Sequence, residues 1–243
     1  MRALLSFFTA LPLGGSSLEA AARQVYLLPL VGLFTGAPGV ALFLLGHALP
    51  PSVVATLALG TVLLAAGLHH TDGVLDTGDA LMVRGTQERR RGVLKDHRVG
   101  VGAIWALFVV YAPALAALVA LADDSLARAA LGLLAGEVAV RAAILLALAF
   151  GEPAERSSSS APFVRSLEGR RRALGVALAL LGPLLCLLPL GGLVPLVALS
   201  IPLTVSFALG VARAAFGGIT GDLLGATGEA ARTVLLVALS ATI

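Results

Sequence analysis

Residues 126–150 read LARAALGLLAGEVAVRAAILLALAF and contain only three charged side chains, those of Arg128, Glu137 and Arg141. A helix needs about 20 mainly apolar residues to cross the hydrocarbon core of a bilayer, and this segment is long enough. The whole chain has the same character, because 58% of its 243 residues are hydrophobic and only 13% are charged. Soluble domains carry about 25% charged residues. The composition therefore excludes a disordered chain and argues against an ordinary soluble enzyme.

Further apolar segments of similar length lie on both sides of this one. They predict an all-α fold, a polytopic helical bundle integral to the membrane with six to seven transmembrane helices in a single domain over residues 1–243. The last segment is too short for a full crossing unless it is tilted or extends backwards past Gly228, and the chain before Tyr26 is a candidate interfacial helix. The predicted spans are Tyr26–Leu49, Ser52–Gly67, Val99–Ala122, Leu126–Phe150, Ala173–Leu190, Leu193–Val211 and the terminal Ala231–Ile243.

The basic residues predict the orientation of the bundle, because cytoplasmic loops next to spans retain Lys and Arg. With the N-terminus inside and seven crossings, all 17 Lys and Arg residues except Arg128 and Arg141 fall on the inner side. The long polar connections then share that side, and the other side has only short turns. We therefore expect a multi-pass protein of the cell membrane (inner or plasma membrane) with its N-terminus and any active site facing the cytoplasm. These connections are His69–Arg98, Gly151–Arg172 and Ala212–Ala230.

The most informative polar stretch, His69–Ala80, directly follows the second predicted span. It contains Asp72, Asp76 and Asp79, spaced by four and then three residues, which places the carboxylates on one face of a helix. Like charges on one face repel each other, most strongly where water is scarce, so a cation should compensate them. Carboxylates are hard oxygen donors, so we expect Mg²⁺, with Mn²⁺ as the alternative, bound to these residues and to substrate phosphates. A solvated polar helix end is the simpler interpretation.

A basic cluster follows within a few helical turns. Its last part, Lys95-Asp96-His97-Arg98, directly precedes Val99–Ala103, where glycines allow close approach of a neighbouring helix or a ligand. Asp96 is the candidate for a fourth metal-binding carboxylate, and Lys95 and Arg98 are candidates for holding phosphate oxygens. The arginines at 89–91 are more typical of topology determinants and contacts with anionic lipid.

Two more polar groups lie in or beside later spans. Thr220 and Asp222 stand at an expected helix start, where backbone N–H groups can bind phosphate, and Glu229 follows. A capped helix N-terminus would explain the same residues. Glu137 and Arg141 stand four residues apart in one span, so they can pair with each other or mark an intramembrane functional site.

Three motifs in this order resemble cobalamin synthase, the adenosylcobinamide-GDP ribazoletransferase family. They are H-x-x-D-G-x-x-D-T-x-D at His69–Asp79, the Lys95–Gly100 segment, and Gly218–Ala226 with Glu229. The opening Phe8–Pro12 also resembles the start of that family. Between the motifs, Ser157–Ser160 is typical of a flexible loop.

The resemblance implies a membrane-embedded catalytic domain that acts at the last stage of cobalamin nucleotide-loop assembly. Such an enzyme joins adenosylcobinamide-GDP to α-ribazole, or to α-ribazole 5′-phosphate, with Mg²⁺ and releases GMP. Metals on the four carboxylates would bind the diphosphate while the ribazole 5′-hydroxyl attacks the phosphorus on the corrinoid side, which is phosphoryl-group transfer. The catalytic candidates are Asp72, Asp76, Asp79, Asp96 and His69, and the substrate-binding candidates are Lys95, Arg98, Thr220, Asp222, Glu229 and Arg141.

The implied partners are these two substrates, membrane lipid and other enzymes of the cobalamin pathway, with no nucleic acid. Two other functions remain open at this point. A CDP-alcohol phosphotransferase also strings Asp residues along membrane helices, although Leu75-Asp76 stands where that family has Ala-Arg. A transporter would use Glu137 and Arg141 as an intramembrane site, but it predicts polar residues scattered through several spans.

Overall fold

The computed structural model describes residues 1–96, 98–155 and 159–243, so His97 of the basic motif and part of the predicted 157–160 loop lie outside the described residues. Within these ranges the chain is helical, and an isolated bridge between Pro153 and Ile219 is the one β-type pairing. The predicted all-α class is confirmed. The α-helices are α1 (Arg2–Phe8), α2 (Leu18–Ala22), α3 (Leu28–Leu45), α4 (Pro51–Ala65), α5 (His69–Met82), α6 (Gln87–Val93), α7 (Val101–Asp124), α8 (Leu126–Phe150), α9 (Ala161–Ser166), α10 (Gly169–Leu187), α11 (Ser200–Val211) and α12 (Gly221–Ser240).

Short helical segments of other types extend several of these helices. Four are 3₁₀ segments and one, at the end of α11, is a π-helix, in the order Val25–Leu27, Gly46–Ala48, Leu188–Leu190, Val194–Leu199 and Ala212–Phe216. With these extensions, six helical segments of the described chain are long and apolar enough to cross a membrane. They are Val25–Ala48, Val101–Asp124, Leu126–Phe150, Gly169–Leu190, Val194–Phe216 and Gly221–Ser240.

The α4–α5 pair supplies a seventh candidate span, and it is sharply bent. The two helices meet the length and hydropathy requirement only together, and their axes differ by 92° across the break. Gly67 and Leu68 make the bend with φ angles of 81° and 60°. The left-handed conformation costs a residue with a Cβ about 1–2 kcal/mol, so packing around Leu68 must hold the bend in place. The predicted number of six to seven spans is confirmed, and the second predicted span, Ser52–Gly67, is the α4 arm of this pair.

The last helix, α12, begins ten residues before the predicted terminal segment Ala231–Ile243. α12 begins at Gly221, where the Thr220 side chain accepts a hydrogen bond from Leu223 N at 3.2 Å as an N-cap. The prediction that the terminal segment extends backwards past Gly228 is confirmed. As a result, the polar residues Asp222 and Glu229 belong to the same helix as the apolar terminal run.

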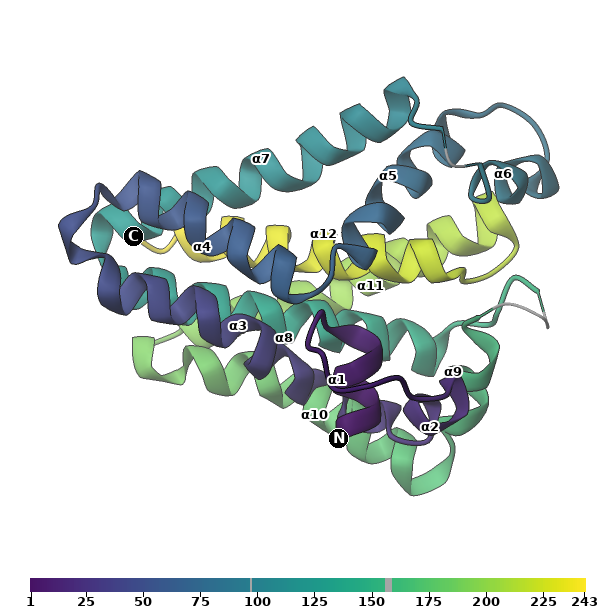
Figure 1. The fold of residues 1–243 in the computed structure, drawn as a ribbon, viewed down its shortest axis with the longest axis horizontal. Helices are drawn as coiled ribbons and strands as arrows, with labels where there is room; N and C mark the ends of the chain where they lie inside the picture. Colours follow the sequence, from purple (N-terminus) through teal and green to yellow (C-terminus); the bar gives the residue numbers. More distant parts are fainter. Residues whose placement is uncertain (97, 156–158) are drawn as a thin grey trace.

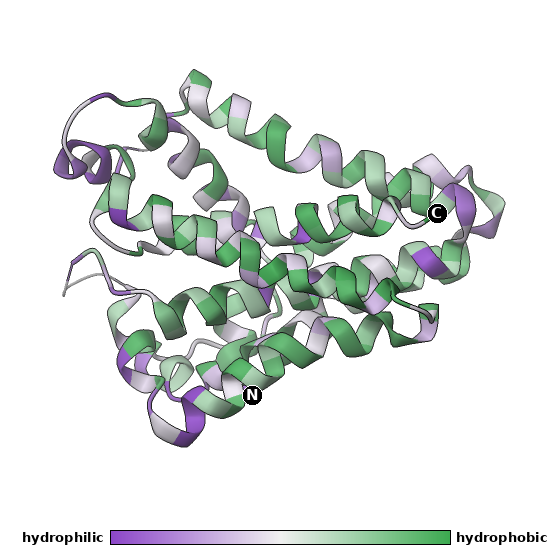
Figure 2. Ribbon diagram, turned by 180° about the vertical axis from the view of Figure 1, so that it is seen from behind, coloured by the Kyte–Doolittle hydropathy of each residue, from purple (hydrophilic) through white to green (hydrophobic). Residues whose placement is uncertain are grey.

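Helix α8 lies at the centre of the bundle and packs against α3, α10 and α12. The long helices run side by side, while α5, α6 and α9 gather at one end and the α3–α4 and α7–α8 turns lie at the other with the C-terminus (Figure 1). Figure 2 shows hydrophobic residues along the length of the bundle and a concentration of hydrophilic ones around α6. This arrangement places the chain on either side of α6 and α9 at one end, as the seven-span prediction requires, but the predicted connection Ala212–Ala230 is shorter than expected because residues 221–230 belong to α12.

Glycines allow α5 to lie close to its two neighbours, α12 and α7. A Cβ on Gly73 would stand 2.5 Å from the carbonyl oxygen of Asp222, and a Cβ on Gly78 would stand 2.6 Å from the carbonyl oxygen of Gly102. Close-packed interiors do not accommodate such overlaps without a shift of the helices. The glycines therefore bring the acidic helix against the start of α12 and the start of α7.

Candidate active site

The acidic stripe is helical, as its spacing predicts. Asp72, Asp76 and Asp79 all belong to α5; Asp72 is exposed, and the other two are half-buried. Because α5 lies between α7 and α12, its carboxylates meet groups from both helices. The carboxylates of Asp72 and Asp79 therefore face different neighbours.

Asp79 lies against the N-terminus of α7. Its carboxylate accepts hydrogen bonds from Gly100 N at 2.6 Å and from Ala103 N at 2.9 Å. These are N–H groups that have no partner within the helix, and a carboxylate also interacts favourably with the positive end of the helix dipole. Asp79 thus caps the N-terminus of α7, although it lies 21 residues before Gly100 in the chain.

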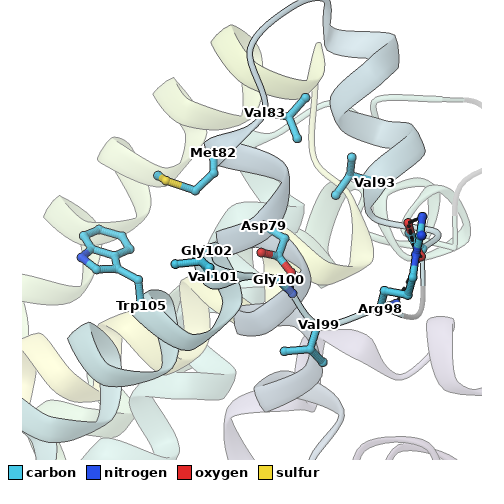
Figure 3. A pocket seen from close by; sticks show the side chains of 11 residues that line it. Asp79, Met82, Val83, Val93, Arg98, Val99, Gly100, Val101, Gly102 and Trp105 are labelled. Atoms are coloured by element: carbon cyan, nitrogen blue, oxygen red, sulfur yellow. Dashed lines mark hydrogen bonds and ion pairs between the residues drawn. The ribbon is translucent and has the colours of Figure 1, made fainter.

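Asp96 pairs with Arg98 beside this cap. The shortest contact joins Arg98 Nη2 and Asp96 Oδ2 at 2.8 Å. These hydrogen bonds and the charge of Asp96 raise the pKa of the exposed Arg98 guanidinium. Both residues line a cavity of about 800 Å³ that we call the Trp105 cavity. Figure 3 shows Asp79 beside Gly100 in this cavity, with Trp105 and Arg98 on opposite sides of them.

A second cavity, of about 430 Å³, lies where α1, α5, α9 and the start of α12 meet. The rings of Phe7, Phe8 and Phe163 form one part of its wall, and we call it the aromatic cavity. His69, His70, Asp72 and Asp222 also line it. This cavity is where the structure brings together predicted site residues from the first and third motifs.

A third cavity, of about 290 Å³, adjoins the aromatic cavity, and Ser159, Gly221 and Asp222 line both. It is lined by two basic side chains, Arg91 and Lys95, and by two acidic ones, Glu155 and Asp222, and we call it the basic cavity after the first pair. The predicted residues Lys95, Thr220 and Asp222 therefore share one cavity. Arg91 was assigned to topology and lipid contact from the sequence, but it is held in this wall by Glu155 Oε1 at 3.1 Å and by the carbonyl oxygen of Phe216 at 2.8 Å.

A cluster of fully buried charges lies deeper in the bundle. Arg232 pairs with Glu137 at 2.6 Å and with Glu229, and the other carboxylate oxygen of Glu137 accepts from the Thr35 hydroxyl at 2.7 Å. Arg141 donates from Nη1 to Nδ1 of His70 at 2.8 Å. The expected pairing of Glu137 with Arg141 is thus replaced by a pairing across helices with Arg232.

This burial separates two predicted substrate-binding residues from the cavities. Glu229 and Arg141 are 1% and 0% exposed, and neither lines the three cavities described above. Nε and Nη2 of Arg141 have no hydrogen-bond partner among the described residues. Arg141 reaches the aromatic cavity only through His70.

The four predicted metal ligands do not converge. Within the described ranges, no three His, Cys, Asp or Glu side chains form a group that could hold a metal ion. Asp79 caps α7, Asp96 pairs with Arg98, and Asp72 lies in the wall of a different cavity. Their roles in metal binding and catalysis stay predictions.

The aromatic wall was not identified from the sequence. Phe7 and Phe8 come from the first helix and Phe163 from the short helix α9, so their proximity depends on the tertiary fold. The sequence held one signal, the resemblance of the opening Phe8–Pro12 segment to the start of the family. In the structure Phe8 of this segment lines the aromatic cavity.

Comparison with known proteins shows similarity along the whole chain. The family described as Cobalamin-5-phosphate synthase matches residues 1–240. A Pyrobaculum calidifontis protein named adenosylcobinamide-GDP ribazoletransferase is 36% identical over 238 residues, covering 98% of this chain and 97% of that protein. Proteins of the same name from Pyrobaculum islandicum and Bradyrhizobium diazoefficiens are 35% and 33% identical, and the alignments cover 97% and 99% of this chain and 92% and 93% of those proteins. No solved structure matches the chain significantly.

Proposed function

Because the chain belongs to the cobalamin-5-phosphate synthase family, we propose that it joins its substrates at the border of the aromatic and basic cavities. The activity is that of an adenosylcobinamide-GDP ribazoletransferase in cobalamin biosynthesis, which joins adenosylcobinamide-GDP with ribazole. One observation carries the proposed location: Asp222 lines both cavities, and Asp72 lines the aromatic one. A reaction between two substrates needs two adjoining subsites, and these two differ in chemistry.

The basic cavity suits the diphosphate of adenosylcobinamide-GDP. Lys95 supplies positive charge beside the Arg91–Glu155 ion pair, and the cavity lies at the N-terminus of α12, where backbone N–H groups and the helix dipole favour anions. We propose that these groups hold the diphosphate with its corrinoid-side phosphorus toward Asp222. The GMP side then remains among the basic groups as the leaving group.

The transfer step forms one bond and breaks one. A hydroxyl oxygen of ribazole bonds to the corrinoid-side phosphorus while the bond between that phosphorus and the oxygen of GMP breaks. His69 lines the aromatic cavity next to Asp72, and we propose that it accepts the proton of the attacking hydroxyl. GMP carries away the electron pair of the broken bond.

The attacking hydroxyl differs from the one expected from the sequence. The family description names cobalamin 5-phosphate as the product, so a phosphorylated ribazole keeps its 5-phosphate. The 5′-oxygen of that substrate cannot be the nucleophile. We therefore replace the 5′-hydroxyl with another ribose hydroxyl in this mechanism.

The carboxylates at the border fit Mg²⁺, with Mn²⁺ as the alternative. Mg²⁺ usually keeps several waters and is bound through one or two carboxylates together with substrate phosphates. Asp72 and Asp222 provide two such carboxylates in one wall, and the glycine contact at Gly73 brings their backbones together. The ion would neutralise the diphosphate and favour departure of GMP.

The exposed surface supports a location within lipid. Large apolar side chains such as Trp105, Phe108 and Phe207 are exposed on the long helices. We propose a plasma-membrane protein with its cavities and N-terminus on the cytoplasmic side, because the Arg-rich connections lie at the cavity end of the bundle.

The direct test uses the full chain purified into nanodiscs, with adenosylcobinamide-GDP and α-ribazole as substrates. The expected result is release of GMP and corrinoid product in equal amounts, with loss of both when a chelator removes Mg²⁺. Absence of product from a folded preparation that reacts with CDP-alcohol substrates would contradict the proposal and favour a CDP-alcohol phosphotransferase.

A further inference from the structure

The three phenylalanines of the aromatic cavity form a mutual contact. The ring centroids of Phe7 and Phe8 lie 5.0 Å apart, those of Phe7 and Phe163 lie 5.6 Å apart, and those of Phe8 and Phe163 lie 5.8 Å apart. These separations are typical of favourable aromatic packing. Three rings from two distant segments therefore make one aromatic cluster with interplanar angles of 57° to 66°, in which Phe7 and Phe8 are the more exposed rings and Phe163 lies beneath them.

Contacts with the bundle hold this surface in place. Ala10 N donates to the carbonyl oxygen of Ala65 at 2.9 Å, which ties the end of the α1 segment to the bend between α4 and α5. Phe163 is 5% exposed and packs in the core. The aromatic wall is thus part of the folded bundle and is set in position before a ligand arrives.

The rest of the cavity divides into an apolar part and a polar part. Ile144, Leu148 and Leu224 add aliphatic surface to the three rings. Of the polar lining, Ser159 and Asp222 lie at the border with the basic cavity because they line both. A ligand that fits this cavity has an apolar, flat portion and a polar portion directed toward that border.

We propose that the aromatic cavity is the subsite for the dimethylbenzimidazole base of ribazole. This base is a flat pair of fused rings with two methyl groups and no N–H donor when it is bonded to ribose. It can stack on the phenylalanines, and its one remaining polar ring atom, the acceptor N3, needs a single donor, which a serine hydroxyl of the lining can supply. The ribose then faces Asp72 and Asp222, where its hydroxyl meets the diphosphate. This assignment rests on the proposed function and places one of the two substrates, ribazole, in the aromatic cavity.

Guanine, the competing aromatic group, is a poorer match for this wall. Its edge carries an amide N–H, an amino group and a carbonyl oxygen, which only the polar lining of this cavity, such as Asp72 and Asp222, can pair, whereas the phenyl and aliphatic part of the wall cannot. The basic cavity is the better place for the guanosine nucleotide, because it combines Lys95 and Arg91 with the start of α12. The two substrates are thus separated by the chemistry of the two cavities.

The test compares KM values of the full chain in nanodiscs for the two substrates. Phe7→Leu and Phe8→Leu keep apolar volume but remove an aromatic face of the cavity wall. Since stacking of a base on an aromatic side chain contributes about 1–3 kcal/mol, we expect the KM for α-ribazole to rise about tenfold or more. The KM for adenosylcobinamide-GDP should remain close to that of the unmodified protein. Phe207→Leu is the matched control, because Phe207 is 76% exposed on α11 and should change neither value.

Two results would overturn the assignment. One is a rise in the KM for adenosylcobinamide-GDP alone, which would place the guanosine or corrinoid portion in the aromatic cavity. The other is no change in either KM in folded Phe7→Leu and Phe8→Leu proteins. Both differ from failure of the proposed function, in which the unmodified protein forms no product from the two substrates.

A binding measurement on the unmodified protein tests the same assignment without any variant, so it does not depend on whether a variant folds. Equilibrium dialysis with α-ribazole alone should show binding that free dimethylbenzimidazole displaces and GMP does not. Displacement of α-ribazole by GMP, with no effect of dimethylbenzimidazole, would contradict the assignment.

Discussion

Arg141 of α8 donates a hydrogen bond from Nη1 to Nδ1 of His70 in α5 over 2.8 Å. A guanidinium can only donate, so Nδ1 must be the acceptor, and the proton of the neutral ring resides on Nε2. His70 also lines the aromatic cavity. The contact therefore joins the site helix to the buried charge cluster and fixes the tautomer of a ring in the cavity wall.

We predict that this contact stabilises the fold. His70→Leu removes the acceptor and leaves the buried Arg141 guanidinium with no partner there, which should cost about 1–3 kcal/mol. His70→Asn offers an oxygen near the position of Nδ1 and should recover part of the loss. Thermal unfolding in detergent measures both. A His70→Leu protein as stable as the unmodified one would show that the bond contributes nothing.

The buried Arg232 should matter far more than an ion pair at the surface. Arg232→Met leaves Glu137 and Glu229 buried with no cation between them, and breaking such a cluster typically costs about 3–5 kcal/mol. Arg128→Met is the matched control, because it removes a partly exposed pair with Asp124 at 3.0 Å, worth about 0–1 kcal/mol. Equal losses of unfolding temperature in the two variants would contradict this reasoning.

The cap made by Asp79 predicts a structural effect that is separate from catalysis. Asp79→Ala removes the acceptor for Gly100 N and Ala103 N, so the free energy of unfolding without metal should fall by about 1–2 kcal/mol. Asp72→Ala removes an exposed carboxylate and should change it by less than about 0.5 kcal/mol. If Asp79 were only a metal ligand, both variants would unfold like the unmodified protein in chelator.

The close approach of α5 and α12 gives a test of site assembly. Gly73→Ala places a methyl group 2.5 Å from the Asp222 carbonyl oxygen, so the helices must separate and activity should fall together with stability. Gly60→Ala lies in α4 with nothing within 4 Å of the new Cβ. That control should be neutral or slightly more stable, since Ala favours helices over Gly by about 1 kcal/mol. Full turnover in Gly73→Ala would refute the close packing of α5 on α12.

The sequence was sufficient for the bundle and for the helical acidic stripe. Apolar segments such as Leu126–Phe150 have to span or lie in the membrane, and the four-and-three spacing of the Asp residues places them on one helix. The bend at Gly67 and Leu68 was not predictable, because Leu68 adopts a left-handed conformation that only its tertiary surroundings stabilise. That bend sets the site helix α5 at 92° to α4, the arm that matches the predicted span Ser52–Gly67.

The partners of the polar groups were the least predictable part. The helical spacing of Glu137 and Arg141 suggested a local pair, but the closest partner of Glu137 comes from Arg232, 95 residues later in the chain. In the same way, the Asp79 cap depends on the close packing of α5 against α7 at Gly78 and Gly102. Sequence spacing predicts which residues share a helix face but does not predict which other helix will cover that face.

The location of the transfer step is tested by turnover in Asp222→Asn and Asp72→Asn proteins in nanodiscs, with GMP and corrinoid product followed together. Asp123→Asn is the control, because this exposed carboxylate lies at the far end of α7. If transfer takes place at the border of the two cavities, both site variants should lose turnover by at least about 100-fold while remaining folded, and the control should keep it. Undiminished turnover in folded Asp222→Asn and Asp72→Asn proteins would show that transfer takes place elsewhere in the molecule.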